Sequence, residues 1–380
     1  MRVLQFGGGN FIRAFVGPAV AALNELEGFD ASITIVKPTE RGDYEALRVQ
    51  NGRYHLLVKG FLDGQVVDEV QCIDVVDRVI QPYSAWDDFL ATAADPSYRI
   101  VTSNTTESGI RFVPENLVAG VCPKEFPAKL CAWLYARWRA IPDSDPLYVL
   151  PCELLPDNGD ELKKCVRAYS AHWSLPSAFL SWLEEACIFV NSLVDRIVSG
   201  RPDPVETAWD RIGERDELVA VAEPYLLWAI EDVTGLQELF PLHRTNFHAI
   251  FTKELDRYRR MKVRILNGSH ILMVYTGIPA GIQTVAEYVD QPEWGAWLRR
   301  VLQEEILPVL PYPKEELDEY AKQVWDRFRN PFLHHKLADI ALNKHDKWEV
   351  RIIPTVEDYY TEFGQGPPLI GKLDLSALGD

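Results

Sequence analysis

The sequence predicts an α/β protein, in which a doubly wound parallel sheet is followed by a mostly α-helical C-terminal domain. Short β-branched runs alternate with amphipathic helical stretches through the N-terminal half, which is the pattern of a parallel sheet covered by helices. The first β-rich run leads directly into three glycines, and from about residue 255 onward the patterns are helical. We therefore expect a first domain over residues 1–254 and a second over residues 255–380.

The N-terminal domain is expected to alternate strands and helices. The expected strands are residues 3–6, 32–36, 99–103, 148–151 and 187–190. The expected helices are residues 11–26, 83–94, 124–139, 160–173 and 177–186, the fourth with Asp157 or Asn158 as its N-cap. Two further β-rich runs, residues 54–59 and 65–73, flank Asp63-Gly64. This dipeptide predicts a hairpin, because both central residues of the turn need a positive φ.

The C-terminal domain begins with a long helical pattern over residues 253–275, which Gly277 and Pro279 close. Further helices are expected at about residues 294–309, 314–329 and 333–342. This run of helices without β-rich segments between them predicts a mostly helical domain.

The composition excludes several classes of protein. Of the 380 residues, 47% are hydrophobic and 25% are charged, which is typical of a globular chain and excludes disorder. The net charge of −17 disfavours nucleic acid and anionic membranes as partners. The six cysteines form no C-x-x-C pair, and no apolar run approaches the roughly 18 residues of a membrane span. We expect a cytoplasmic protein with reduced thiols, without a signal peptide, and we leave its oligomeric state open.

The turn after the first strand is a candidate cofactor site. Gly7 and Gly9 match the first two positions of G-x-G-x-x-G, whereas Ile12 occupies the third. At this place backbone N–H groups can receive a pyrophosphate, so the turn predicts a Rossmann-like dinucleotide site. A plain glycine-rich turn is the alternative. The candidate cofactor-binding residues here are Phe6, Gly7, Gly8, Gly9, Asn10 and Phe11.

Two other strand ends belong to the same candidate site. Lys37 stands about where an acidic residue usually binds the ribose hydroxyls. It therefore leaves NADP open beside NAD, although Glu40 could reach the ribose and a solvated lysine is an equally good interpretation. Asn104, Thr105 and Thr106 follow the strand at residues 99–103 and could face the ligand crevice, or form an ordinary polar loop.

The long C-terminal helix carries the candidate catalytic side chains. At 100° per residue Asn267 lies about 140° and His270 about 80° from Lys262, so the three share one broad face. Apolar residues surround them, and we expect this helix to be buried, which makes a charged lysine costly and suits it to acid/base chemistry. Gly268 costs about 1 kcal/mol of helix propensity, which suggests that a ligand or another backbone comes close. A polar contact between domains is the alternative. The histidines lack partners at ligand spacing, so we expect no catalytic metal.

Together these segments resemble the mannitol dehydrogenase family, the polyol-specific long-chain dehydrogenases. The resemblance rests on residues 7–15, 104–107 and 191–197 and on Lys262, Asn267 and His270, and it extends to Arg327-Phe328-Arg329-Asn330-Pro331. It implies an NAD-dependent, metal-independent oxidoreductase that interconverts a keto sugar acid and its hydroxy acid, with tagaturonate and altronate as the expected pair.

The resemblance also implies roles for four residues. Lys262 would be the general acid/base, Asn191 and Asn267 would hydrogen-bond the reacting oxygen, and His270 would orient the substrate. This fits the chemistry, because charge that grows on the oxygen during hydride transfer is stabilised by amide N–H donors and neutralised by a proton from an ammonium group.

Several alternatives stay open. They are fructuronate reduction, 2-dehydrogenation of mannitol or arabinitol, a non-catalytic dinucleotide-binding regulator, and Schiff-base chemistry on Lys262. A substrate carboxylate would need a cationic partner, for which the candidates are Arg257, Arg260, Arg264 and Lys336.

Overall fold

The computed structural model describes residues 1–105, 107–333, 335–373 and 375. The chain forms two compact units. The N-terminal unit comprises Met1–Leu57, Val70–Ala222 and Leu226–Leu255, and the helical unit comprises Val58–Glu69, Glu223–Tyr225 and Asp256–Asp380. Two short segments that precede residue 254 thus belong to the helical unit, which the sequence did not indicate.

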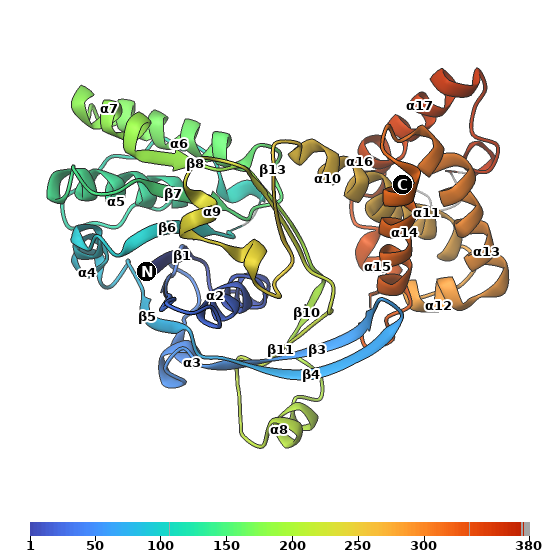
Figure 1. The fold of residues 1–380 in the computed structure, drawn as a ribbon, viewed down its shortest axis with the longest axis horizontal. Coiled ribbons are helices and arrows are strands. Elements are labelled where there is room, and N and C mark those ends of the chain that lie inside the picture. The colour runs from blue at the N-terminus through green and yellow to red at the C-terminus, as the bar shows by residue number, and fades with distance from the viewer. Residues whose placement is uncertain (106, 334, 374, 376–380) are drawn as a thin grey trace. The chain divides into compact units, whose positions relative to one another are not determined.

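A parallel sheet organises the N-terminal unit (Figure 1). Within the described residues it has six strands in the order β5-β2-β1-β6-β7-β8, all paired in parallel. The strands are β1 (Arg2–Phe6), β2 (Ser32–Val36), β5 (Val76–Ile80), β6 (Tyr98–Ser103), β7 (Leu147–Pro151) and β8 (Cys187–Phe189). The chain runs outward in both directions from β1, so the topological switch point lies between β1 and β6, where ligands of doubly wound sheets bind. The predicted fold class is confirmed.

The strand β5 was not predicted. Its sequence places charged Asp77 and Arg78 between apolar residues, and at the sheet edge both remain exposed. An edge strand needs fewer apolar residues than a central one, so its pattern is weak.

The N-terminal unit also contains helices. Within the described residues they are α1 (Asn10–Arg13), α2 (Val16–Asn24), α3 (Glu45–Val49), α4 (Trp86–Ala91), α5 (Phe126–Ala140), α6 (Asn158–His172), α7 (Ser177–Ala186), α8 (Glu206–Ile212) and α9 (Leu236–Leu239). In Figure 1, α5, α6 and α7 lie together along β7 and β8. The core between them contains large, fully buried side chains such as Trp133, Tyr169 and Phe179.

The first helix is interrupted, contrary to the single helix predicted over residues 11–26. α1 ends at Arg13 and α2 begins at Val16. Pro18 has no N–H to donate to the carbonyl of Ala14, four residues earlier. The guanidinium of Arg196 donates to that carbonyl instead, at 2.5 Å. Because Arg196 is 182 residues away, the local pattern could not reveal the break.

The other strands of the described residues form two smaller sheets. One has the order β10-β11-β3-β4, with β3 (Tyr54–Leu62), β4 (Gln65–Ile73), β10 (Val198–Gly200) and β11 (Ala220–Ala222). The other has the order β13-β12-β9, with β9 (Ser192–Asp195), β12 (Leu227–Glu231) and β13 (Ala249–Thr252). The predicted hairpin is confirmed, since Asp63 and Gly64 have φ values of 51° and 74°.

The helical unit is mostly helical, as predicted. Its helices are α10 (Leu255–Met261), α11 (Gly268–Gly277), α12 (Val285–Asp290), α13 (Pro292–Val301), α14 (Lys314–Phe328), α15 (Leu337–Ile340), α16 (Lys344–Arg351) and α17 (Ile353–Phe363). Two π-helical segments, η4 (Lys262–Asn267) and η5 (Leu302–Ile306), interrupt this pattern. Every residue of α11 is buried, and α12, α13, α15 and α16 pack against it.

The two short segments are attached to the helical unit by specific polar contacts. Glu223 and Arg327 form an ion pair of 2.8 Å in which each side chain is 1% exposed, and the Arg327 guanidinium lies over the ring of Tyr225. In the hairpin, Gly64 donates its N–H to Asp326 at 2.9 Å. Charge-assisted contacts of this kind fix the turn and the short segment to the rest of the helical unit.

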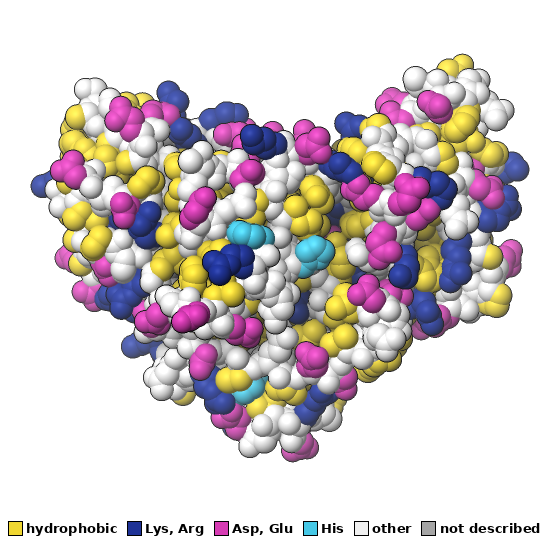
Figure 2. Space-filling model, viewed as in Figure 1, with side chains coloured by type: hydrophobic (Ala, Val, Ile, Leu, Met, Phe, Trp, Pro, Cys, Tyr) yellow, Lys and Arg dark blue, Asp and Glu magenta, His cyan; other side chains and the backbone are white. Residues whose placement is uncertain are grey.

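The surface carries both signs of charge. Figure 2 shows basic and acidic side chains interspersed over the visible face, without a continuous basic area. No described helix is both long and apolar enough to cross a membrane.

Candidate active site

The glycine turn has the shape of a dinucleotide cradle. Gly7 has a φ of 114°, and a Cβ at this position would lie 2.9 Å from the carbonyl oxygen of Asn104. Gly7 donates its N–H to Val36, and Asn104 donates its N–H to Phe6, so three strand ends meet here. A Cβ on Gly9, by contrast, would meet nothing within 4 Å. Close backbone packing on one side and open space on the other fit a pyrophosphate beside the turn.

A tyrosine that was not among the predicted site residues covers part of this turn. The N–H of Gly8 donates to the hydroxyl of Tyr44 at 2.7 Å, and the Tyr44 ring lies 2.9 Å from the place of a Gly8 Cβ. Burial raises the pKa of Tyr44. Because 36 residues separate the two partners, no local motif marks their contact.

Phe11, the last candidate of this turn, stacks on Phe15 at 5.2 Å between ring centroids.

Lys37 is engaged with its own loop. Its side-chain ammonium donates to the carbonyls of Thr39 and Glu40, at 2.5 and 2.9 Å, and the residue is 3% exposed. Burial lowers the pKa of this ammonium. The interpretation of Lys37 as a solvated surface lysine is therefore wrong.

A buried carboxylate that the sequence analysis did not select holds the loop after β6. Glu153 accepts hydrogen bonds from the hydroxyl of Ser103 and from both the N–H and the hydroxyl of Thr105, at 2.9 to 3.0 Å. Burial raises the pKa of Glu153. Asn104 donates its side-chain N–H to the carbonyl of Cys152. Thr106, the third candidate of this loop, lies outside the described residues.

Asn191 lies in the N-terminal unit, between β8 and β9, and caps α6. Its side-chain oxygen accepts the N–H groups of Gly159 and Asp160 at 3.0 and 3.1 Å. Asp157 occupies the N-cap position, but its side chain makes no capping hydrogen bond, so the prediction of Asp157 as the capping side chain is wrong. The reason is its left-handed backbone, with a φ of 51°, whereas a capping side chain works from an extended residue.

Lys262 and Asn267 begin and end the π-helical segment of the helical unit. The N–H of Gly268 donates to the carbonyl of Val263, five residues earlier, which is the π-helical pattern. The α-helical angles expected between these side chains therefore do not apply, and Lys262 and Asn267 lie on successive turns. Both are half-buried. π-Helical turns inside α-helices occur frequently at functional sites.

His270 follows on the first turn of α11 and is buried, as expected of this helix. Its Nε2 atom has no hydrogen-bond partner among the described residues. The rings of His335 and Phe328 lie 4.8 and 5.0 Å away between centroids. Burial lowers the pKa of His270 well below its ordinary value, and His335 and Arg327 lower it further. A neutral imidazole with an unused nitrogen is suited to hydrogen-bond a polar ligand.

Gly268 has a close backbone neighbour, as the sequence suggested. A Cβ on Gly268 would lie 3.5 Å from the carbonyl oxygen of Arg351, which is ordinary van der Waals contact. Unlike Gly7, this position has room for a methyl group.

The four cationic candidates for a substrate carboxylate differ in what they contact. Arg257 pairs with Glu316, and Arg264 pairs with Asp358 and donates to Thr355. Arg260 and Lys336 are exposed, and neither has an ion pair among the described residues. Arg260 and Lys336 are thus the two candidates whose charge is not paired within the described residues.

The described residues contain no group of three potential metal-ligating side chains of His, Cys, Asp and Glu. All six cysteines are free thiols, as expected.

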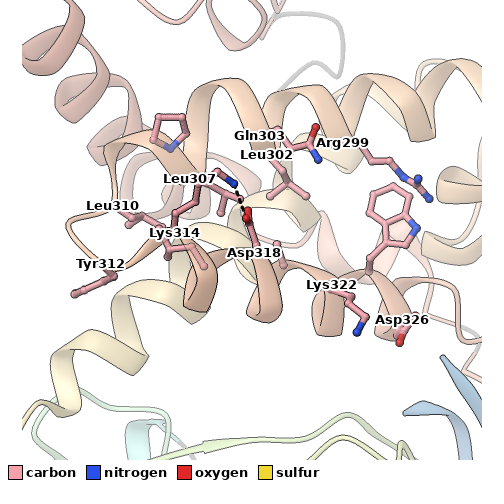
Figure 3. Close-up of a pocket in the computed structure, with 14 residues that line it drawn as sticks. Arg299, Leu302, Gln303, Leu307, Leu310, Tyr312, Lys314, Asp318, Lys322 and Asp326 are labelled. Atoms are coloured by element: carbon pink, nitrogen blue, oxygen red, sulfur yellow. Dashed lines mark hydrogen bonds and ion pairs between the residues drawn. The ribbon is translucent and has the colours of Figure 1, made fainter. Parts of the chain in front are cut away.

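The helical unit also contains a separate cavity of about 880 Å³ (Figure 3). It lies between α14 and the segment from α13 to residue 312, and its wall is mainly apolar, with Lys314 paired to Asp318 at one side. Lys262, Asn267 and His270 do not line it.

Comparison with known proteins identifies the family. The model of the mannitol dehydrogenase Rossmann domain matches residues 1–242, and that of the mannitol dehydrogenase C-terminal domain matches residues 254–370. The chain belongs to the mannitol dehydrogenase family. The resemblance seen in the sequence is therefore confirmed.

Individual members of the family agree with this assignment. The chain is 37% identical to the altronate oxidoreductase of Halalkalibacterium halodurans, over 99% of this chain and 74% of that protein. It is also 37% identical to the altronate oxidoreductase of Bacillus subtilis, over 96% and 76%.

Two solved structures share the fold. One is D-sorbitol dehydrogenase in substrate-free form, with a TM-score of 0.82 and 23% identity over 99% of this chain and 78% of that one. The other is Pseudomonas fluorescens mannitol 2-dehydrogenase in a ternary complex with NAD and D-mannitol, with a TM-score of 0.74 and 24% identity over 95% and 75%.

Proposed function

We propose that this chain is an NAD-dependent altronate oxidoreductase, which reduces tagaturonate to altronate and catalyses the reverse reaction. The observation that carries the proposal is the match to altronate oxidoreductases at 37% identity over 99% of the chain. Together with the two matched domain models, it makes the protein a dehydrogenase that acts on CH–OH groups. The identity of the substrate and the roles of the individual residues are what we propose beyond this reaction class.

NADH, when bound, supplies the hydride. The glycine turn from Phe6 to Phe11 would receive its pyrophosphate, with Asn104 and Thr105 beside it, because the turn leaves open space only on the side of Gly9. NAD is favoured over NADP because Lys37, the cation expected beside the ribose, is not available to a 2′-phosphate. The ammonium of Lys37 instead donates to two carbonyls of its own loop.

Three polar side chains would act on the reacting oxygen. Amide N–H groups of Asn191 and Asn267 would stabilise the negative charge that grows as hydride reaches the ketone carbon. The ammonium of Lys262 would then give its proton to that oxygen, which completes the hydroxyl group. In the oxidation of altronate the neutral amine would take the proton back. No metal ion is needed, because the lysine and the two amides polarise the oxygen.

Two further groups would select the substrate. His270 has an unused, buried Nε2, which would hydrogen-bond a sugar hydroxyl and so orient the ketone. The substrate carboxylate would pair with Arg260 or Lys336, the two cationic candidates without an ion pair among the described residues.

An absorbance assay of NADH tests this function. The reductions of tagaturonate, fructuronate and fructose are compared with the oxidations of altronate, mannitol and arabinitol, and kcat/KM is expected to be highest for the tagaturonate and altronate pair. A higher kcat/KM with fructuronate or with an uncharged polyol would contradict the substrate assignment. NADH binding without consumption by any of these compounds would instead indicate a non-catalytic regulator.

A further inference from the structure

One N–H group of the glycine turn is bonded to a side chain. The N–H of Gly8 donates to the hydroxyl oxygen of Tyr44 at 2.7 Å. Gly8 is buried, so its N–H depends on a protein or ligand atom for a partner. Because backbone N–H groups of such a turn are the donors that a dinucleotide phosphate uses, the phenol oxygen stands where a phosphate oxygen could bind.

This hydroxyl is held by a single hydrogen bond. It accepts from Gly8, and its own hydrogen has no acceptor among the described residues. A bond from an N–H to a neutral phenol is roughly half as strong as a bond to a charged acceptor. A phosphate oxygen would therefore displace the Tyr44 hydroxyl from the Gly8 N–H with a gain in hydrogen-bond strength.

A buried positive charge acts on the same oxygen. Arg13 on α1 is 4% exposed, and its guanidinium donates to the side-chain oxygen of Asn10 at 2.7 Å. Its Nε and Nη1 atoms have no hydrogen-bond partner among the described residues. Burial raises the pKa of Tyr44, whereas the N–H of Gly8 and the charge of Arg13 oppose this rise. A buried guanidinium with unused donors favours an anion over a neutral phenol at this place.

Only the side chain of Tyr44 would have to move to admit such an anion. The carbonyl of Tyr44 accepts the N–H of Arg48 at 3.1 Å in the first turn of α3, and the side chain of Asp43 accepts the N–H of Glu45. These bonds fix the backbone on both sides. A rotation about the Cα–Cβ bond of Tyr44 leaves all of them unchanged, and residues 39–43, which precede it, are exposed.

We propose that the Tyr44 hydroxyl holds the place of a phosphate oxygen of the dinucleotide, and that cofactor binding turns this side chain away from the Gly8 N–H. Tyr44 thereby lowers the affinity for the cofactor, because one hydrogen bond of the turn must break before the phosphate binds. This inference rests on the proposed function, in which the glycine turn receives the pyrophosphate of NADH.

The substitution Tyr44→Phe tests this competition. The variant keeps the ring but leaves the buried N–H of Gly8 without its partner until a phosphate binds. The Kd for NADH, measured by isothermal titration, is therefore expected to fall about five- to tenfold. A tyrosine that merely supported the turn would have the opposite effect, since its loss would weaken binding. An unchanged or higher Kd would overturn the inference.

Tyr148→Phe is the matched control. The Tyr148 hydroxyl donates to the carbonyl of Thr234 at 2.8 Å, and both residues belong to the N-terminal unit. The control thus removes the same atom from the same unit without touching the glycine turn, and its Kd for NADH is expected to equal that of the unchanged protein. An equal fall of the Kd in this variant would overturn the assignment to Tyr44.

Crystal structures of the unchanged protein with and without NADH show the exchange directly. A phosphate oxygen is expected within hydrogen-bond distance of the Gly8 nitrogen, with Tyr44 in a different rotamer. Tyr44 still bonded to Gly8 beside bound NADH would overturn this inference and leave the proposed function standing. Failure of both the unchanged protein and Tyr44→Phe to bind NADH would overturn the proposed function together with the inference.

Discussion

In the N-terminal unit, the candidate site residues lie at the ends of strands and are held by polar partners. Asn191 has a partner for its backbone N–H, its carbonyl and both ends of its amide, and Glu153 fixes the loop that carries Thr105. In the helical unit, the candidates lie along one helix, and the Nε2 atom of His270 has no partner among the described residues. The first group is preorganised by hydrogen bonds. The second is placed by helix packing, and within it the Nε2 atom of His270 stays available for a ligand.

Among these substitutions, removal of the Lys262 side chain should lower kcat most. Lys262→Ala is expected to lower kcat about 10²- to 10⁴-fold, because the proton donor is lost. The KM for NADH should stay nearly unchanged, since Lys262 belongs to the unit without the glycine turn. Steady-state kinetics and NADH fluorescence titration measure the two effects. A comparable loss of NADH affinity would show that the substitution disturbs more than the proton transfer.

Alanine substitutions at the two asparagines should lower kcat alike but change the free energy of unfolding differently. Asn191→Ala and Asn267→Ala are each expected to lower kcat about 10²-fold, as the loss of one donor to a developing oxyanion does. Asn191→Ala should also lower the free energy of unfolding by about 1 kcal/mol, because it removes the cap of α6. Asn267 makes no side-chain hydrogen bond within the described residues, so its variant should keep its stability. Urea denaturation of both variants checks this, and equal stability losses would argue against the difference between the two regions.

Alanine substitutions at Gly7 and Gly268 should have opposite consequences, one weakening NADH binding and the other raising stability. Gly7→Ala is expected to weaken NADH binding by about tenfold or more, because a Cβ would sit 2.9 Å from a backbone oxygen at a φ of 114°. Gly268→Ala should leave binding unchanged and raise the free energy of unfolding by up to about 1 kcal/mol, because Gly268 has helical φ and ψ values of −60° and −48°. Isothermal titration with NADH and thermal unfolding measure both. A destabilised Gly268→Ala would show that its contact with Arg351 is tighter than ordinary packing.

The buried histidine should make stability depend on pH. The pKa of His270 is lowered by burial, whereas in the unfolded chain it is about 6.5. As pH falls below about 6.5, the unfolded chain binds a proton that the folded chain excludes, so stability present at neutral pH is lost toward acid. His270→Gln should reduce this loss by at most about 1.4 kcal/mol per pH unit. Urea denaturation between neutral pH and pH 5.5 measures the slope, and His335 and His248, whose pKa values are also lowered by burial, remain in both proteins. An identical slope in the variant would contradict this account.

Much of the fold follows from local sequence. The alternation of β-rich and helical runs specified the parallel sheet, and Asp63-Gly64 specified the separate β3–β4 hairpin, because periodicity and turn chemistry depend on near neighbours. The π-helical segment was missed, because residues 262–267 have the same apolar pattern that an α-helix would have. The break before α2 was also missed. Pro18 leaves the carbonyl of Ala14 without its usual helical donor, and the side chain that donates to this carbonyl belongs to Arg196, far along the chain.

The sequence by itself determined the family, the glycine turn and the residue types from which the chemistry is proposed, because these depend on the order of motifs along the chain. The tertiary structure alone decided how those residues are held. Tyr44 on Gly8, Glu153 on Thr105 and Asn191 on the first turn of α6 join residues that are 31 to 48 positions apart. Such contacts exist only where the fold brings distant segments together, since a buried polar group must find a partner wherever the fold places one.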